Sequence, residues 1–189
     1  MLALSLIKNK IFKYKNLNLP KKINQNKCRI KIKYSGICSS DIPRAFENKS
    51  YYYPIVLGHE FSGTIVSFGK NVKTFKVGDE VTAYPLIPKK KIDTNLERQG
   101  KYNLCENYSY LGSRENGSFC EYLDVYEWNL YKIKKGLSLK LASIQEPTAV
   151  AFNVAEKKKK KKKNVLIIGA GFISQIILRI LFRENLNVT

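Results

Sequence analysis

The chain has 189 residues, of which 44% are apolar, and this length suits one ordinary domain or one domain and part of a second. The composition argues against a disordered chain or a collagen repeat, and no apolar stretch approaches the roughly 20 residues that a membrane span needs. The formal net charge is +19. Residues 1–7 carry no leading positive charge and no cleavage motif, so we expect no signal peptide, no membrane partner and a cytoplasmic protein.

The basic charge has two interpretations. A run of seven lysines at residues 157–163 leaves +12 of the +19 for the rest of the chain. A nucleic acid or an anionic membrane would attract such a surface. Biased composition is the other explanation, because Lys, Asn, Ile and Tyr share adenine- and thymine-rich codons. We favour biased composition and predict no specific nucleic-acid partner, because the remaining lysines are scattered among apolar residues.

The first 130 residues have the pattern of a β domain. Residues 29–34 alternate polar and apolar side chains, so Ile30, Ile32 and Tyr34 can face a core while the charged residues face water. Short β-branched or aromatic runs follow at residues 63–66, 80–83 and 121–125, separated by turn residues. Many short strands of this kind predict a barrel or a sandwich.

The pattern becomes helical after Gly136. Ser138 can cap a helix that begins at Leu139, Pro147 interrupts or restarts it, and residues 148–155 are again compatible with a helix. Seven like charges cannot pack together, so the lysine run is a solvated segment or a frayed helix end.

An α/β unit is predicted after the lysine run. Residues 165–168 form an apolar strand, and a glycine loop and a helix follow it. The apolar face of this helix comprises Ile173, Ile176, Ile177, Ile180 and Leu181. We therefore expect the first βα unit of a doubly wound domain, which is truncated because the chain stops there. The predicted division is a β domain at 1–137, a helical linker at 138–163 and an incomplete α/β domain at 164–189.

The glycine loop at residues 169–174 predicts dinucleotide binding. Gly169 and Gly171 would let the backbone approach a pyrophosphate at the start of the helix, beside Phe172 and Ile173. Ser174 stands where the fingerprint has its third glycine. The acidic residue that would contact the ribose is expected beyond the end of the chain, so NAD and NADP both remain open.

The chain contains one histidine, His59, and a lone histidine is more often structural than a ligand. Its context favours a metal site. Cys38 precedes it in the segment 36–41, and Glu146 follows far downstream in Gln-Glu-Pro. Thiolate, imidazole and carboxylate are the ligand types of a catalytic Zn²⁺, which uses three protein ligands and one open position.

Four segments carry a resemblance to a known family: residues 36–41, 54–63, 77–81 and 165–171. The sequence resembles the zinc-containing medium-chain alcohol and polyol dehydrogenases, in the branch of sorbitol dehydrogenase, from about Ile7 to the end of the chain. Segments 40–44, 84–88 and 112–117 are most similar to members that act on polyol phosphates. The resemblance implies a GroES-like β-barrel followed by a Rossmann domain, and hydride transfer from a polyol or polyol phosphate to NAD or NADP.

The resemblance also implies roles for individual residues. Cys38, His59 and Glu146 would hold the catalytic zinc, which polarises the substrate hydroxyl. Ser40 would pass the alcohol proton towards solvent, and Asp41 would orient the ligating imidazole. Glu60 would lie beside the metal as an alternative ligand or a charge balance. The alternative for Ser40, Asp41 and Glu60 is ordinary turn and surface chemistry.

The sequence departs from the family where a second, structural zinc is usually bound by four cysteines. Lys89, Ile92 and Asn95 stand at three of these positions, and only Cys105 is retained. Lysine is positively charged and isoleucine has no lone pair, so we predict that the structural zinc is absent.

The substrate and the state of the enzyme are less determined. Arg44 and Arg114 are candidates for a sugar-phosphate group, and each is equally well explained as a surface charge. Most of the cofactor domain and the returning C-terminal segment of the family are missing, so we expect the 189-residue chain alone to be inactive. The alternative function is an inactive remnant or a basic zinc- or anion-binding module. For a full-length relative, the resemblance is compatible with a homo-oligomer.

Overall fold

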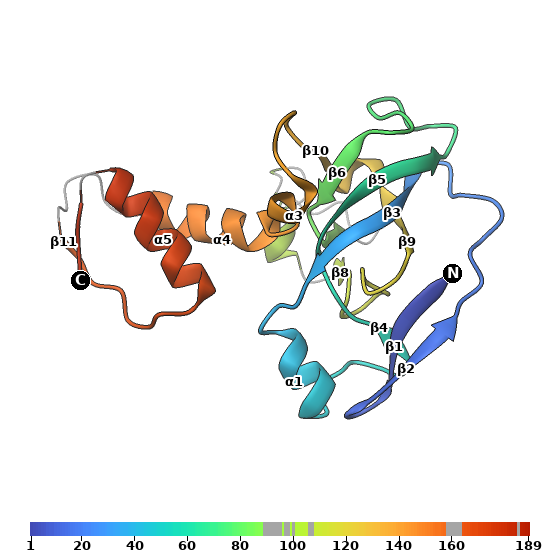
Figure 1. The fold of residues 1–189 in the computed structure, drawn as a ribbon, viewed down its shortest axis with the longest axis horizontal. Helices are drawn as coiled ribbons and strands as arrows, with labels where there is room; N and C mark the ends of the chain where they lie inside the picture. Colours follow the sequence, from blue (N-terminus) through green and yellow to red (C-terminus); the bar gives the residue numbers. More distant parts are fainter. Residues whose placement is uncertain (89–95, 97–98, 100, 106–107, 158–163, 185) are drawn as a thin grey trace. The chain divides into compact units, whose positions relative to one another are not determined.

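The computed structural model describes residues 1–88, 96, 99, 101–105, 108–157, 164–184 and 186–189. These residues form two compact units, Met1–Ser143 and Ile144–Thr189, which are described separately (Figure 1). Lys89, Ile92 and Asn95 lie outside the described residues, so the predicted absence of a structural zinc stays a prediction. None of the described helices has the length and apolar character needed to cross a bilayer.

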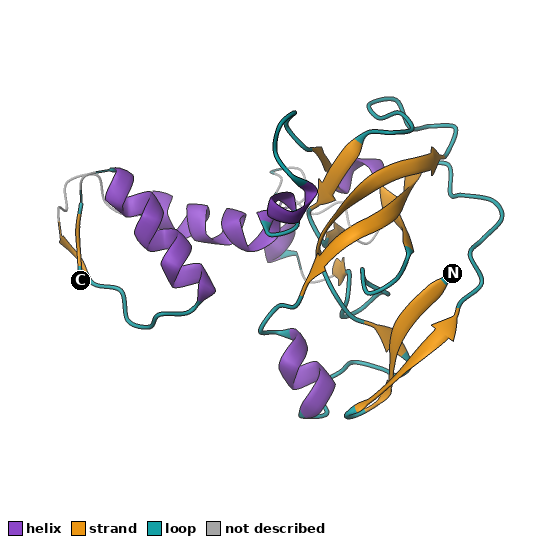
Figure 2. Ribbon diagram, in the orientation of Figure 1, coloured by secondary structure: helices purple, strands orange, loops and turns teal. Residues whose placement is uncertain are grey.

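Antiparallel strands joined by long loops are the main secondary structure of the first unit (Figure 2). The largest described sheet has the order β10-β6-β5-β3-β9, and smaller sheets join β2-β1-β4 and β7-β8. The strands are β1 (Leu2–Lys8), β2 (Ile11–Asn16), β3 (Lys27–Gly36), β4 (Ile55–Val56), β5 (Glu60–Phe68), β6 (Glu80–Ala83), β7 (Leu86–Pro88), β8 (Tyr108–Tyr110), β9 (Tyr122–Tyr126) and β10 (Leu130–Lys132). This confirms the predicted β-rich architecture and its curled, barrel-like sheet.

Short helices connect the strands of this unit. The described ones are α1 (Asp41–Phe46), η1 (Tyr102–Leu104), η2 (Glu127–Asn129) and α3 (Leu139–Ala142). The predicted cap of α3 is confirmed, because the Ser138 side chain accepts a hydrogen bond from the Leu141 N–H at 3.3 Å. Helix α1 was not predicted from the sequence.

The core of the first unit lies between the large sheet and the segments that cover it. Phe61, Ile65 and Ile30 are fully buried there, and Ile32 packs against them from a partly buried position. The predicted inward position of Tyr34 is wrong, because 41% of this residue is exposed. The pairing of β3 with β5 shifts register between Ile32 and Tyr34, and this irregularity breaks the alternation of faces.

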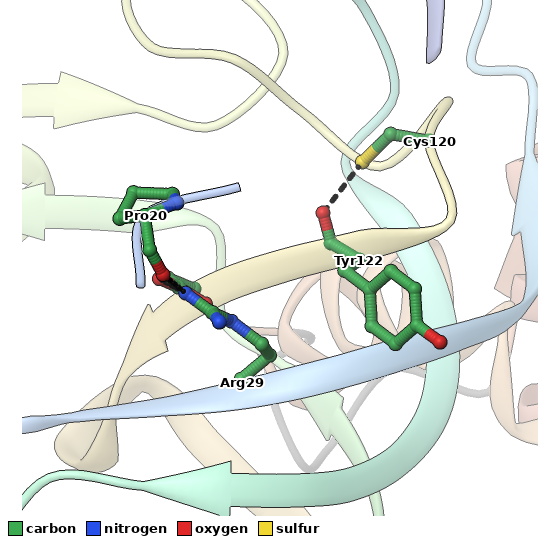
Figure 3. Close-up of polar contacts among 5 residues, drawn as sticks. Pro20, Arg29, Cys120 and Tyr122 are labelled. Carbon is green, nitrogen blue, oxygen red and sulfur yellow. Dashed lines mark hydrogen bonds and ion pairs between the residues drawn. The ribbon is translucent and has the colours of Figure 1, made fainter. Parts of the chain in front are cut away.

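Arg29 contradicts the expectation that the charged residues of β3 face water, since it is only 8% exposed. Its Nε and Nη2 donate to the two carboxylate oxygens of Asp124, each at 2.8 Å, from the neighbouring strand β9. Nη2 also donates to the Pro20 carbonyl at 2.8 Å (Figure 3). The hydrogen bond with Asp124 raises the pKa of Arg29. A bidentate pair of this kind satisfies a buried guanidinium.

Replacing Arg29 with methionine should lower the free energy of unfolding by about 2–3 kcal/mol, because it leaves the Asp124 carboxylate without its partner. Urea unfolding followed by circular dichroism measures the change. Lys31→Met, on an exposed residue of the same strand, is the matched control and should stay within about 0.5 kcal/mol of the parent. Equal stabilities of the two variants would contradict a stabilising role for the ion pair.

The second unit contains two helices and two short strands: α4 (Gln145–Glu156), β11 (Asn164–Val165), α5 (Phe172–Arg183) and β12 (Asn187–Val188). Strands β11 and β12 pair in parallel, so the described unit is a complete βαβ crossover and extends the predicted βα unit by one strand. Pro147 lies in the first turn of α4, where its missing N–H costs no helical hydrogen bond.

The strand predicted at 165–168 is shorter than expected. Only Asn164 and Val165 are in β11, and Leu166 and Ile168 are 69% and 90% exposed. Within the described unit, β12 is the one strand beside β11, and it is two residues long, so little pairing is available to extend β11. The predicted apolar face of α5 is seen at Leu181, which is buried, while Ile173 is 38% exposed.

Candidate metal centre

Two adjacent strands carry the candidate metal ligands. Strand β3 ends at Gly36, which pairs with Glu60, the first residue of β5. Cys38 follows the end of β3 by two residues, and His59 immediately precedes β5. The antiparallel pairing therefore brings these side chains together from segments that are separate in the sequence.

The ligand atoms of Cys38, His59 and Glu60 all lie within 4.8 Å of one another. His59 and Glu60 are buried, and Cys38 is half-buried. Zinc binds sulfur at about 2.3 Å and imidazole nitrogen at about 2.0 Å, so in a tetrahedral site two such ligand atoms lie about 3.5 Å apart. The limit of 4.8 Å is wider than this spacing, so the side chains would move closer together to share one ion. The donor set therefore fits zinc.

Gly36 makes room for the carboxylate of this cluster. A Cβ at Gly36 would lie 2.6 Å from Glu60 Oε2, so any other residue at position 36 would require the Glu60 carboxylate to move. The absence of a side chain at the end of β3 thus permits the Glu60 carboxylate to point towards Cys38 and His59. The sequence shows Gly36 two residues before Cys38, but the role of this glycine was not predicted.

Asp41 lies beside the cluster at the start of α1 and is 2% exposed. Its Oδ2 accepts a hydrogen bond from the Cys38 N–H at 3.1 Å, and its Oδ1 lies 3.8 Å from His59 Nδ1. Burial raises the pKa of Asp41, although the nearby His59 opposes this effect. This position suits a carboxylate that orients the imidazole, and the orienting role stays a prediction.

The surroundings of Cys38 favour its thiolate form. A hydrogen bond with His59 lowers the pKa of the Cys38 thiol, burial opposes this, and hydrogen bonds with Ser40 lower the pKa further. The thiolate is the form of cysteine that binds metals. Ser40 is therefore beside the candidate metal ligand, and its predicted role in proton transfer stays a prediction.

Three glycines support the segment that leads to His59. Gly58 has φ +93°, and a Cβ at Gly112 or Gly117 would collide with the Gly58 backbone. Residues 56–58 pair with residues 117–119 through three backbone hydrogen bonds of 2.7 to 3.0 Å. The His59 ring also contacts Tyr110 edge-on, with centroids 5.5 Å apart. Sequence reasoning missed these supports, because they join segments about 60 residues apart.

The two candidate substrate arginines have different surroundings. Arg44 Nη1 donates to the Ser40 carbonyl at 2.5 Å, so its guanidinium supports the turn that carries Ser40. The Arg114 guanidinium lies 4.8 Å from the ring centroid of Tyr51 and 4.2 Å from that of Tyr108. It also donates to the Tyr51 hydroxyl at 3.1 Å. Arg114 is therefore held between two aromatic rings, and its role in substrate binding stays a prediction.

The remaining predicted residues belong to other parts of the structure. Glu146 is half-buried in the first turn of α4, in the second unit, and its role as a ligand stays a prediction. Gly169 has φ +108°, and Gly171 caps α5, which begins at Phe172. A Cβ at either glycine would meet nothing within 4 Å among the described residues, so the loop backbone is open to a close ligand. Cys105 is buried, with its Sγ 3.6 Å from the Lys101 carbonyl oxygen.

A half-buried cysteine, a buried histidine and a buried glutamate thus meet beside paired strands of a curled antiparallel sheet. Residues 24–135 match the family "Alcohol dehydrogenase GroES-like domain", and the chain belongs to this family. This confirms the resemblance found from the sequence motifs.

Among curated relatives, the chain is similar to galactitol 1-phosphate 5-dehydrogenase of Escherichia coli, with 39% identity over 158 residues, 82% of this chain and 44% of the relative. Sorbitol dehydrogenase of Halalkalibacterium halodurans is 33% identical over 147 residues, 76% of this chain and 42% of the relative. The chain thus spans a little under half the length of these relatives.

Solved structures of dehydrogenases have a similar fold over the whole of this chain. Galactitol-1-phosphate dehydrogenase from Escherichia coli matches with a TM-score of 0.88 and 34% identity, over 100% of this chain and 54% of that one. A short chain alcohol dehydrogenase from Escherichia coli, complexed with the cofactor NADH, matches with a TM-score of 0.90 and 29% identity, over 100% of this chain and 55% of that one.

Proposed function

We propose that this chain supplies the zinc-binding catalytic domain of a dehydrogenase that transfers a hydride from a polyol phosphate to NAD or NADP. The observation that carries the proposal is the convergence of Cys38, His59 and Glu60 within 4.8 Å in the fold of this family. The similarity to galactitol 1-phosphate 5-dehydrogenase supports galactitol 1-phosphate as the substrate. Segments 40–44, 84–88 and 112–117, which resemble the members of the family that act on polyol phosphates, also support this substrate.

The chain's own residues have distinct tasks in this proposal. Cys38 and His59, with a carboxylate from Glu60 or Glu146, would hold a zinc ion, which when bound supplies Lewis-acid chemistry at the substrate hydroxyl. Asp41 holds the Cys38 backbone and faces the His59 ring, and so keeps both ligands oriented.

Other residues transfer the proton and bind the cofactor. The Ser40 hydroxyl takes up the proton that leaves the alcohol and passes it towards solvent. Gly169 and Gly171 bring open backbone to the pyrophosphate of the dinucleotide at the start of α5, beside Phe172 and Ile173.

Arg114 is the better candidate for the substrate phosphate. Arg44 already donates to the Ser40 carbonyl, whereas Arg114 is positioned by stacking between Tyr51 and Tyr108. Stacking on aromatic rings orients a guanidinium without using all of its five N–H donors. The remaining donors suit bidentate contact with a phosphate.

The test uses the chain completed with the remaining part of the Escherichia coli relative, because the chain covers 44% of that relative. We expect cofactor-dependent oxidation of galactitol 1-phosphate in preference to galactitol, measured by the absorbance of the reduced nicotinamide. Arg114→Met should remove most of this preference, whereas Arg44→Met should leave the preference intact. A completed chain that binds zinc but oxidises neither compound would contradict the proposal and favour the inactive zinc- or anion-binding module.

A further inference from the structure

A cavity of about 450 Å³ opens on the first unit, away from the cluster of candidate metal ligands. It lies between the turn at residues 21–25, which precedes β3, and the end of β5 with the turn that follows it. Its lining includes none of the candidate metal ligands. Nothing in the proposed dehydrogenase chemistry uses it.

The lining of this cavity is cationic. Lys21 and Lys22 lie on one side and Lys70 on the other, and no carboxylate residue lines it. None of these three lysines forms an ion pair with another described residue. Arg29 also lines the cavity, but Asp124 already neutralises it. Three lysine residues that line one cavity give it a local excess of positive charge, which would attract an anion.

The two walls of the cavity are fixed to each other by the backbone. Gly69 N–H donates to the Lys27 carbonyl and Asn71 N–H to the Gln25 carbonyl, each at 2.9 Å. A Cβ at Gly69 would lie 2.5 Å from the Gln25 carbonyl oxygen, so only glycine permits this close approach. Arg29 Nη2 holds the Pro20 carbonyl at 2.8 Å, directly before Lys21 (Figure 3). The positions of the lysine backbones are therefore set before any ligand arrives.

We propose that this cavity binds a small molecule that carries a chain of two or more phosphate groups. Three lining lysines that form no ion pair within the described part of the chain match such a polyanion, and the volume lies in the range of small-molecule sites, about 300–1,000 Å³. Ser67 and Gln25 add polar side chains to the lining, and Phe68, 41% exposed, offers a ring face. Inorganic pyrophosphate and a nucleoside diphosphate share the required chemistry.

The experiment titrates the ¹⁵N-labelled full chain with inorganic pyrophosphate at about 0.15 M salt, where contacts with diffuse charge are largely screened. We expect saturable shifts of the Ser67, Phe68 and Gly69 amide signals. The combined variant Lys21→Ala, Lys22→Ala and Lys70→Ala should weaken the affinity at these signals at least tenfold. Circular dichroism should show that this variant keeps the fold, because all three side chains are exposed.

The matched control replaces three other exposed lysines with alanine and so removes the same charge elsewhere on the chain. It combines Lys13→Ala, Lys15→Ala and Lys134→Ala. Its affinity for pyrophosphate at the cavity should stay within twofold of the parent. Equal weakening in both variants, or shifts confined to the lysine run and the glycine loop at 169–171, would overturn the proposal. Because the cavity and the predicted dinucleotide loop have different amide signals, binding at one can be distinguished from binding at the other.

Two further titrations define the ligand. If adenosine diphosphate binds the cavity more tightly than pyrophosphate and moves the Phe68 amide signal further, the site takes a nucleotide. Equal affinities of the two compounds would show that the phosphate chain alone is bound. A fluorescent single-stranded oligonucleotide tests the macromolecular alternative. Oligonucleotide binding that the three-lysine variant loses, without any pyrophosphate shift in the cavity, would mean that nucleic acid is the ligand and would overturn the proposal.

Discussion

Purified chain is expected to contain one equivalent of zinc, and Cys38→Ser is expected to contain almost none. The sulfur, nitrogen and oxygen atoms of Cys38, His59 and Glu60 lie within 4.8 Å of one another, and hydrogen bonds favour the thiolate of Cys38. A serine hydroxyl does not ionise near neutral pH and is a poor ligand for zinc. Elemental analysis of the dialysed protein measures the loss directly.

Cys120→Ser is the matched control for this experiment. Its Sγ donates to the Tyr122 carbonyl at 3.1 Å (Figure 3), and burial raises the pKa of Cys120 to about 12. This thiol therefore stays protonated, and its replacement should leave the zinc content unchanged. Full zinc content in Cys38→Ser, or equal loss in both variants, would contradict the proposed ligand.

The two candidate carboxylates can be separated in the same way. Glu60→Gln should lower zinc affinity more than Glu146→Gln, because Glu60 belongs to the described cluster. Asp41→Asn should lower zinc affinity less than Glu60→Gln does. The expected loss is on the order of 10–100-fold, because Asp41 would orient a ligand without binding the metal. A larger loss in Glu146→Gln would instead support the ligand set inferred from the family resemblance.

Gly117→Ala should lower the free energy of unfolding by more than about 3 kcal/mol. A Cβ at this position would overlap the Gly58 carbonyl oxygen and lie 2.6 Å from the Gly112 Cα. Both obstacles are backbone atoms, so no side-chain rotation can relieve the clash. Because Gly117 N–H donates to the Val56 carbonyl at 2.7 Å, the substitution should also displace the segment that precedes His59. Urea unfolding measures the first effect and zinc content the second.

Gly136→Ala is a control that separates two reasons why a glycine is required: lack of space for a side chain and an unusual backbone conformation. A Cβ at Gly136 would meet nothing within 4 Å, but its φ is +91°, so the cost should be about 1–2 kcal/mol from conformation alone. If Gly117→Ala were no more destabilising than Gly136→Ala, close packing against Gly58 would not be what requires a glycine at position 117.

Local patterns predicted the parts of the fold that depend on neighbours in the sequence. The alternation in residues 29–34 predicted β3, and the capping preference of Ser138 predicted the start of α3. The burial of Arg29 was not predictable, because its partner Asp124 is 95 residues away and the strand register decides whether they meet. The exposure of Tyr34 depends on a local shift of that register.

The candidate site shows the same division. The motifs around Cys38 and His59 were recognisable because each is a short segment, and the β3–β5 pairing brings them together. The supports around them were missed: Gly36 beside Glu60, and Gly112 and Gly117 against Gly58. These glycines matter because of close contacts between distant segments, which neither composition nor periodicity reports.

The pairing of Gly36 with Glu60 also affects how the first unit is stabilised. A zinc ion held by Cys38 and His59 would cross-link the end of β3 to the start of β5 and close a loop of about 20 residues. Such a cross-link acts as a staple, because the ion binds the folded chain more tightly than the unfolded one. The metal would thus fasten two interior strands of the large sheet to each other at their ends, and the same ion would serve both chemistry and folding.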